Sequence, residues 1–232
     1  MCFSATASFT AGAGLLLVGA ATARQVRRRP ELPFALIPLL FAVQQLIEGA
    51  LWLTFPDKAP WLNTALTYAY SLFSHVLWPI YVPLAVLLIE PPGWRRKALI
   101  AFSVAGIAVG TWLLYAMARY GIVSRPTGRH VEYVSPHFFA AVAMTLYLLS
   151  TGVSLLFSAH RLVKVFGLLA LLSFAAAYAF YALWFISVWC FFAAVLSGVV
   201  YLHLRNPRVG LHQRVPDTRS HGARARSASQ LH

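Results

Sequence analysis

Three polar side chains in one apolar stretch are the first candidates for chemistry. Gln44 and Gln45 precede Glu48 by four and three residues in an otherwise apolar run, so the three side chains share roughly one face of a helix. A carboxyl group inside a membrane is costly and marks a functional site by default. The alternative is a protonated Glu48 that hydrogen-bonds a neighbouring helix or reaches the nearby interface.

His75 is the second candidate, in the next apolar stretch, with Ser71 before it and Trp78 after it. A neutral imidazole can bind a metal, relay protons or join two helices by a hydrogen bond, and one histidine does not choose among these roles. Pro79 frees a backbone carbonyl that needs a donor, which a hydrated pocket would supply. We therefore expect a polar pocket, with no catalytic residue assigned, that consists of Gln44, Gln45, Glu48, Ser71, His75 and Trp78.

The cysteines are the third candidates. The chain has two, Cys2 and Cys190, and three interpretations stay open: buried thiols, a disulfide, or joint metal ligation. Glu48 and His137 are expected at a similar depth, so a zinc or copper site of Cys2, Glu48, His137 and Cys190 is allowed. The sequence has no CxxC, HxxxH or HExxH spacing, and any cofactor is otherwise unknown.

The elements that must position these residues are membrane helices. The chain is 59% hydrophobic and 11% charged, with a mean hydropathy of +0.68, which excludes a soluble fold. Residues 165–204 contain no Asp, Glu, Lys or Arg, a length that accommodates two crossings. Small residues at Gly106 and Gly110 suggest close helix packing. The expected spans are 6–24, 33–54, 62–89, 98–118, 136–158, 163–181 and 184–204.

The basic residues predict the orientation of this bundle, because Lys and Arg accumulate on the cytoplasmic side. With the N-terminus outside, fifteen of the 19 Lys and Arg are cytoplasmic and four are external. We predict an all-α integral membrane bundle of seven transmembrane helices over 1–205, with the N-terminus outside and the C-terminus cytoplasmic. Residues 206–232 are expected to form a disordered basic tail. The expected location is the inner (plasma) membrane, as a multi-pass protein.

The expected partners are the lipid bilayer and, at the basic cytoplasmic segments, anionic lipids. Nucleic acid is excluded, because no stacking aromatics are interleaved with the arginines of the tail. The oligomeric state is left open.

Three functions remain open at this point. The favoured one is a binding or sensory membrane protein with an outward-facing intramembrane pocket that is polar and open to a metal ligand set. The second is a transporter or channel for protons, ions or a small solute. Residues 76–80 after His75 are apolar or Trp, with Tyr81 next, so the inner half is expected to be dry. The third is a membrane-embedded metal-dependent enzyme that acts on lipid, so enzymatic activity is uncertain.

Several segments carry a resemblance to a known family. The segments are MCFSATASF, PLLFAVQQLIEGALW, WPIYVPLAVLLIEPPGWRR and SVWCFFAAVLS. Together they resemble a family of bacterial multi-span membrane proteins of unassigned activity whose members begin MCFSA. The resemblance covers nearly the whole transmembrane part and implies no reaction. It draws attention to Cys2, Gln45, Glu48, Trp78, Pro79, Trp189 and Cys190.

A second resemblance concerns Ser71 and His75 alone. Their Ser-x3-His spacing is similar to an element of the seven-span zinc hydrolases related to ceramidases and progestin/adiponectin receptors. The final span offers His203 alone in place of the His-x3-His pair of that class. Without three converging ligands, no zinc ion activates a water molecule.

Overall fold

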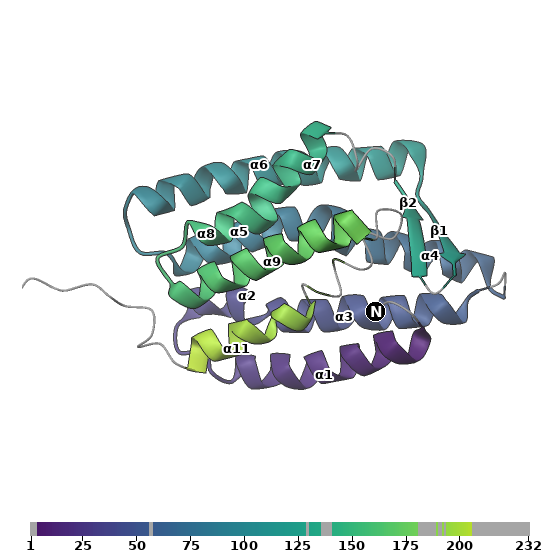
Figure 1. The fold of residues 1–232 in the computed structure, drawn as a ribbon, viewed down its shortest axis with the longest axis horizontal. Coiled ribbons are helices and arrows are strands. Elements are labelled where there is room, and N and C mark those ends of the chain that lie inside the picture. The colour runs from purple at the N-terminus through teal and green to yellow at the C-terminus, as the bar shows by residue number, and fades with distance from the viewer. Residues whose placement is uncertain are drawn as a thin grey trace, which may run out of the picture.

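The fold is a bundle of apolar helices that run side by side along its long axis, with a small β-hairpin at one end (Figure 1). The computed structural model describes residues 4–55, 58–128, 130–135, 141–180, 189, 192 and 194–205. Cys2, His137, Cys190 and the tail 206–232 lie outside these residues. Two clusters of buried apolar side chains hold the described helices together.

Five stretches of helix are long and apolar enough to span a membrane. They are Ala5–Ala23, Arg29–Leu53, Pro60–Ile89, Trp94–Tyr120 and Arg161–Ala179. These confirm the predicted positions of five of the seven apolar stretches. The other two are described only as shorter apolar helices, Ala141–Leu156 and Ala194–Arg205.

The helical elements within these stretches are as follows. The first two stretches contain α1 (Ala5–Ala23), η1 (Arg29–Glu31), α2 (Leu32–Ala35) and α3 (Ile37–Leu53). The next two contain α4 (Pro60–Ser71), η2 (Leu72–Leu77), α5 (Trp78–Ile89) and α6 (Trp94–Tyr120). The rest comprise α7 (Ala141–Leu148), η3 (Leu149–Val153), α8 (Ser154–Leu156), α9 (Arg161–Phe180) and α11 (Gly198–Arg205).

Two helices carry a π-helical segment in the middle of the bundle. The segment η2 joins α4 to α5, and η3 joins α7 to α8. The two helices touch here, since the Tyr147 hydroxyl donates to the Ser74 carbonyl. Pro79 lies two residues after the end of η2 and has no N–H to complete a regular turn. Wide turns of this kind are frequent at functional sites.

The β-hairpin corrects the all-helical prediction. Strands β1 (Val123–Thr127) and β2 (His130–Val134) pair antiparallel, in a segment predicted only as a loop. Gly128 has a φ of 63°, which suits a tight turn. The Ser124 and Thr67 hydroxyls lie 2.7 Å apart and tie the hairpin to α4. Burial lowers the pKa of His130 in β2 below its ordinary value.

Helix α6 packs unusually closely on the helix that contains η2. A Cβ added at Gly106 would lie 1.8 Å from the Pro79 carbonyl oxygen, and one at Gly110 would lie 3.1 Å from that of Val76. Only glycine permits this approach of one helix to another. The close packing predicted from the spacing of these two glycines is therefore confirmed.

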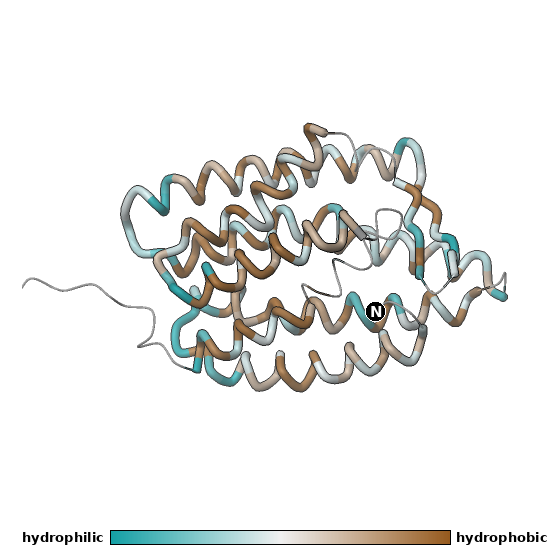
Figure 2. Tube along the Cα trace, viewed as in Figure 1, coloured by the Kyte–Doolittle hydropathy of each residue, from teal (hydrophilic) through white to brown (hydrophobic). Residues whose placement is uncertain are grey.

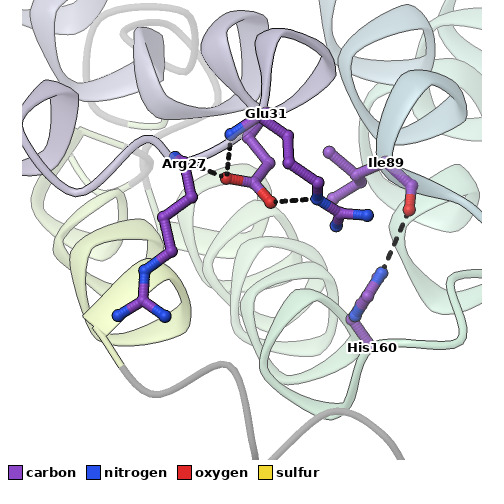
Figure 3. Close-up of polar contacts among 5 residues, drawn as sticks. Arg27, Glu31, Ile89 and His160 are labelled. Carbon is purple, nitrogen blue, oxygen red and sulfur yellow. Dashed lines mark hydrogen bonds and ion pairs between the residues drawn. The ribbon is translucent and has the colours of Figure 1, made fainter.

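The end of the bundle opposite the hairpin is rich in basic residues, and we call it the basic end. It is formed by residues 24–31, 90–97 and 157–164 and by the end of α11 (Figure 1). Hydrophilic positions gather in these turns and hydrophobic ones along the helices (Figure 2). The Glu31 carboxylate accepts hydrogen bonds from the backbone N–H of Arg27 and Arg28 and from Arg28 Nε, and the His160 ring contacts the Ile89 carbonyl (Figure 3).

Candidate functional site

The candidate site begins at a hydrogen bond between α3 and α5. Trp78 Nε1 donates to Gln44 Oε1 over 2.7 Å. The Trp78 ring stacks on Phe41, with ring centroids 3.9 Å apart. Phe41 is nearly a full turn before Gln44, so α3 contacts one indole through both its face and its N–H. The structure thus brings together two residues of the predicted polar pocket, Gln44 and Trp78.

Glu48 and His75 lie at the same level of the bundle, one turn closer to the hairpin. The chain runs in opposite directions in α3 and in the α4–η2–α5 helix. Glu48 follows Gln44 by one turn, and Ser74 and His75 precede Trp78 by about one turn. The Ser74 hydroxyl lies 2.8 Å from His75 Nδ1. Glu48 and His75 are both 0% exposed.

We call these residues the buried polar cluster. It comprises Gln44, Gln45, Glu48, Ser71, Ser74, His75 and Trp78, all of them buried. Every residue predicted for the polar pocket is a member, and Ser74 is an addition. The members come from only two neighbouring helical stretches of the chain.

Several polar atoms of the cluster have no hydrogen-bond partner among the described residues. They are both side-chain amide atoms of Gln45, the Nε2 of Gln44 and the Oγ of Ser71. A buried polar atom without a partner costs about 1 to 3 kcal/mol. Native proteins have few such atoms, and each needs an explanation such as a ligand or water. The amides of Gln44 and Gln45 therefore offer donors and an acceptor to a bound molecule.

An apolar pocket adjoins the cluster on the side of the basic end. It is a small cavity of about 30 Å³, lined mainly by apolar and aromatic side chains from four helical stretches and by Trp189. This volume has room for about two water molecules. We call it the aromatic pocket, after Phe41, Trp78, Tyr147, Phe166 and Trp189. Trp78 belongs to both the pocket and the polar cluster.

Tyr147 is a residue of the site that sequence reasoning missed. Its hydroxyl bonds the Ser74 carbonyl, and its ring lies 5.6 Å from that of Trp189. Tyr70 and Tyr133 are a second omission, and their rings stack 4.4 Å apart on the hairpin side. The only sequence signal for these residues is a phenol within an apolar stretch, which also suits an interface anchor.

Buried hydroxyl groups continue from the site toward the basic end. Ser150, Ser154 and Ser158 are spaced by four residues, and each is 0% exposed. The Ser158 hydroxyl donates to a carboxyl oxygen of Glu90, 2.9 Å away. The Ser150 and Ser154 hydroxyls donate to backbone carbonyls of their own helix. The expectation of a dry inner half therefore stays a prediction.

The predicted metal site is only partly within the described residues. Glu48 is described and buried, whereas Cys2, His137 and Cys190 lie outside the described part of the chain. Among the described residues, no group of three or more His, Cys, Asp or Glu side chains is placed to hold a metal ion. The zinc or copper site stays a prediction.

Comparison with known proteins assigns the chain to a family. A model of a family of unknown function, DUF6629, matches residues 1–214, so the chain belongs to this family. The resemblance drawn from the MCFSA opening and the three internal segments is thereby confirmed. No curated protein and no solved structure matches the chain significantly.

Proposed function

For a member of this family of unknown function, we propose a binding or sensory role in a membrane, with the buried polar cluster as the ligand site. The carrying observation is the set of buried amide atoms of Gln44 and Gln45 that lack hydrogen-bond partners among the described residues. A purely structural polar cluster satisfies its own hydrogen bonds. A binding site keeps some of them open for its ligand.

We also propose that the chain is a multi-pass plasma membrane protein with seven spans and an external N-terminus. Five apolar helices of sufficient length support the membrane location. Among the described residues, ten Lys and Arg lie at the basic end and three near the hairpin. The positive-inside rule makes the basic end cytoplasmic, where anionic lipids are the partners. The polar cluster then lies in the outer half or at the midplane.

Replacing Gln45 with leucine tests the binding role. We expect Gln45→Leu to leave the unfolding temperature of the ligand-free protein unchanged or to raise it, because an unpaired buried amide is removed. The free energy of unfolding should rise by about 1 kcal/mol. The same variant should lose any small molecule that copurifies with the wild-type protein. Scanning fluorimetry and native mass spectrometry of purified protein measure these two effects.

Gln44→Leu is the matched control. It removes a similar amide from the adjacent position but breaks the 2.7 Å bond from Trp78 Nε1, so it should lower the unfolding temperature. If Gln45→Leu destabilises the protein as much as Gln44→Leu does, Gln45 has a structural role and the binding proposal is wrong. Zinc and copper are measured on the same samples and on Cys2→Ser and Cys190→Ser.

The buried hydroxyls favour transport as a second candidate function. Ser150, Ser154 and Ser158 form a row of buried hydroxyls on one helix, and the last of them donates to Glu90. A transporter or channel needs polar groups of this kind along its path. Liposomes that contain the protein and a pH-sensitive dye should then show proton flux, and Ser154→Val should reduce it several-fold. Flux equal to that of empty liposomes would exclude this candidate for protons.

A further inference from the structure

One hydrogen bond links the two π turns in the middle of the bundle. We propose that the Tyr147 hydroxyl is a latch that holds η2 and η3 together as a single hinge between the helices that carry them. This inference rests on the proposed sensory function and names the element that changes conformation in that role. Because Ser74 belongs to the buried polar cluster, the hinge begins inside the proposed site.

The π geometry of η2 leaves one backbone carbonyl without its regular donor. The Trp78 N–H bonds to the Phe73 carbonyl, five residues earlier. The same spacing places the Ser74 carbonyl opposite residue 79, which is proline and has no N–H. The Tyr147 hydroxyl donates to this carbonyl from the neighbouring helix. A side chain of one helix thus replaces a backbone donor that the other helix lacks.

The η3 turn also uses hydroxyl groups as donors to backbone carbonyls. Thr151 Oγ1 donates to the Tyr147 carbonyl over 2.7 Å, and Ser150 Oγ lies 2.9 Å from the carbonyl oxygens of Leu146 and Tyr147. Such bonds compete with backbone N–H donors and bend helices. Because a hydroxyl rotates freely, both turns can exchange hydrogen-bond partners while the helix on either side stays intact.

The latch lies between the polar cluster and the aromatic pocket. On the cluster side, the Ser74 hydroxyl lies 2.8 Å from His75 Nδ1. On the other side, the Tyr147 and Trp78 side chains line the pocket. Ser74 and Tyr147 are each 1% exposed, so bulk water does not replace the latch. A buried carbonyl that loses its donor is costly, and we therefore expect the two π turns to open together.

Amide hydrogen exchange of the full chain in lipid nanodiscs tests the latch. Tyr147→Phe removes the hydroxyl and keeps the ring. Exchange should become about tenfold faster in residues 72–78 and 149–153 together, which corresponds to the loss of one net hydrogen bond. Tyr81→Phe is the matched control, because it removes a hydroxyl that donates to the Pro33 carbonyl over 2.7 Å. This control should leave the exchange of both π turns unchanged.

Pro79→Ala provides a rescue. Alanine supplies an N–H opposite the Ser74 carbonyl, so the double variant of Tyr147→Phe and Pro79→Ala should exchange in η2 at nearly the wild-type rate. If Tyr147→Phe alone does not accumulate as folded protein, the double variant should still do so.

Four results would overturn the inference: unchanged exchange in Tyr147→Phe, faster exchange in only one of the two turns, an equal effect of Tyr81→Phe, or a double variant that is not restored. The proposed function is judged separately by the copurified molecule that Gln45→Leu loses. If both π turns loosen in Tyr147→Phe but no small molecule copurifies, the hinge stands and the binding role fails. If a molecule copurifies but neither turn loosens, binding stands and the latch fails.

Discussion

Gly106→Ala should destabilise the protein by about 3 kcal/mol or more, because the added methyl group meets backbone rather than a movable side chain. The Cβ would lie 1.8 Å from the Pro79 carbonyl oxygen and 2.8 Å from its carbonyl carbon. Helices α6 and α5 must then separate next to the Trp78 wall of the pocket. Yield of monodisperse protein and the unfolding temperature in detergent measure the effect, with an expected fall of about 10 °C.

Gly14→Ala is the control for this substitution. Gly14 also lies inside a helix, α1, but a Cβ there meets nothing within 4 Å. The alanine should leave stability unchanged or raise it by up to about 1 kcal/mol through helix propensity. Equal behaviour of the two variants would contradict the close contact between α6 and α5.

Glu90→Leu is expected to have the second large effect and to lower the free energy of unfolding by about 3 kcal/mol. Glu90 is buried, and its carboxyl oxygens accept from the Ser158 hydroxyl and the Ala159 N–H at 2.9 Å. Leucine leaves both donors buried without this acceptor, and hydrogen bonds to a carboxylate are worth about 1.5 to 3 kcal/mol each. The turn between α8 and α9 should open, which hydrogen exchange of residues 157–161 would detect.

Glu31→Leu provides the comparison. Glu31 also accepts several hydrogen bonds at the basic end, but its partner Arg28 is exposed. An exposed ion pair contributes about 1 kcal/mol or less. If Glu31→Leu lowered the free energy of unfolding more than Glu90→Leu, burial would not govern the strength of these contacts.

The helical architecture was predictable because each membrane-length helix corresponds to a continuous apolar run in the sequence. Such runs gave the positions of α1, α6 and α9 to within a few residues. The hairpin was not predictable, since Val123–Val134 is short and its strands are stabilised by contacts with α4 such as Thr67 to Ser124. Pairing across a tertiary contact leaves no periodic signal in a segment of five residues per strand.

The polar site was predictable where one helix carries the signal. Gln44, Gln45 and Glu48 share a face of α3, so their spacing in the sequence was enough to identify them. Tyr147 and the buried serines were missed because their importance depends on which helix lies beside η2. Neighbour relations between distant helices cannot be read from hydropathy. The two glutamines were therefore identified from the sequence, whereas the aromatic pocket required the structure.

The π-helical turn η2 changes how the site's helix must be drawn on a helical wheel. In an ordinary α-helix, Ser71 and Trp78 would project from almost the same side, because seven residues complete nearly two turns. The extra residue that a π turn accommodates rotates everything after it by roughly 100° relative to what precedes it. A wheel drawn straight through Leu72–Leu77 thus assigns Trp78 and Val82 to the wrong face, and a deletion of one residue there would regularise the helix while leaving the indole on the side of Gln44.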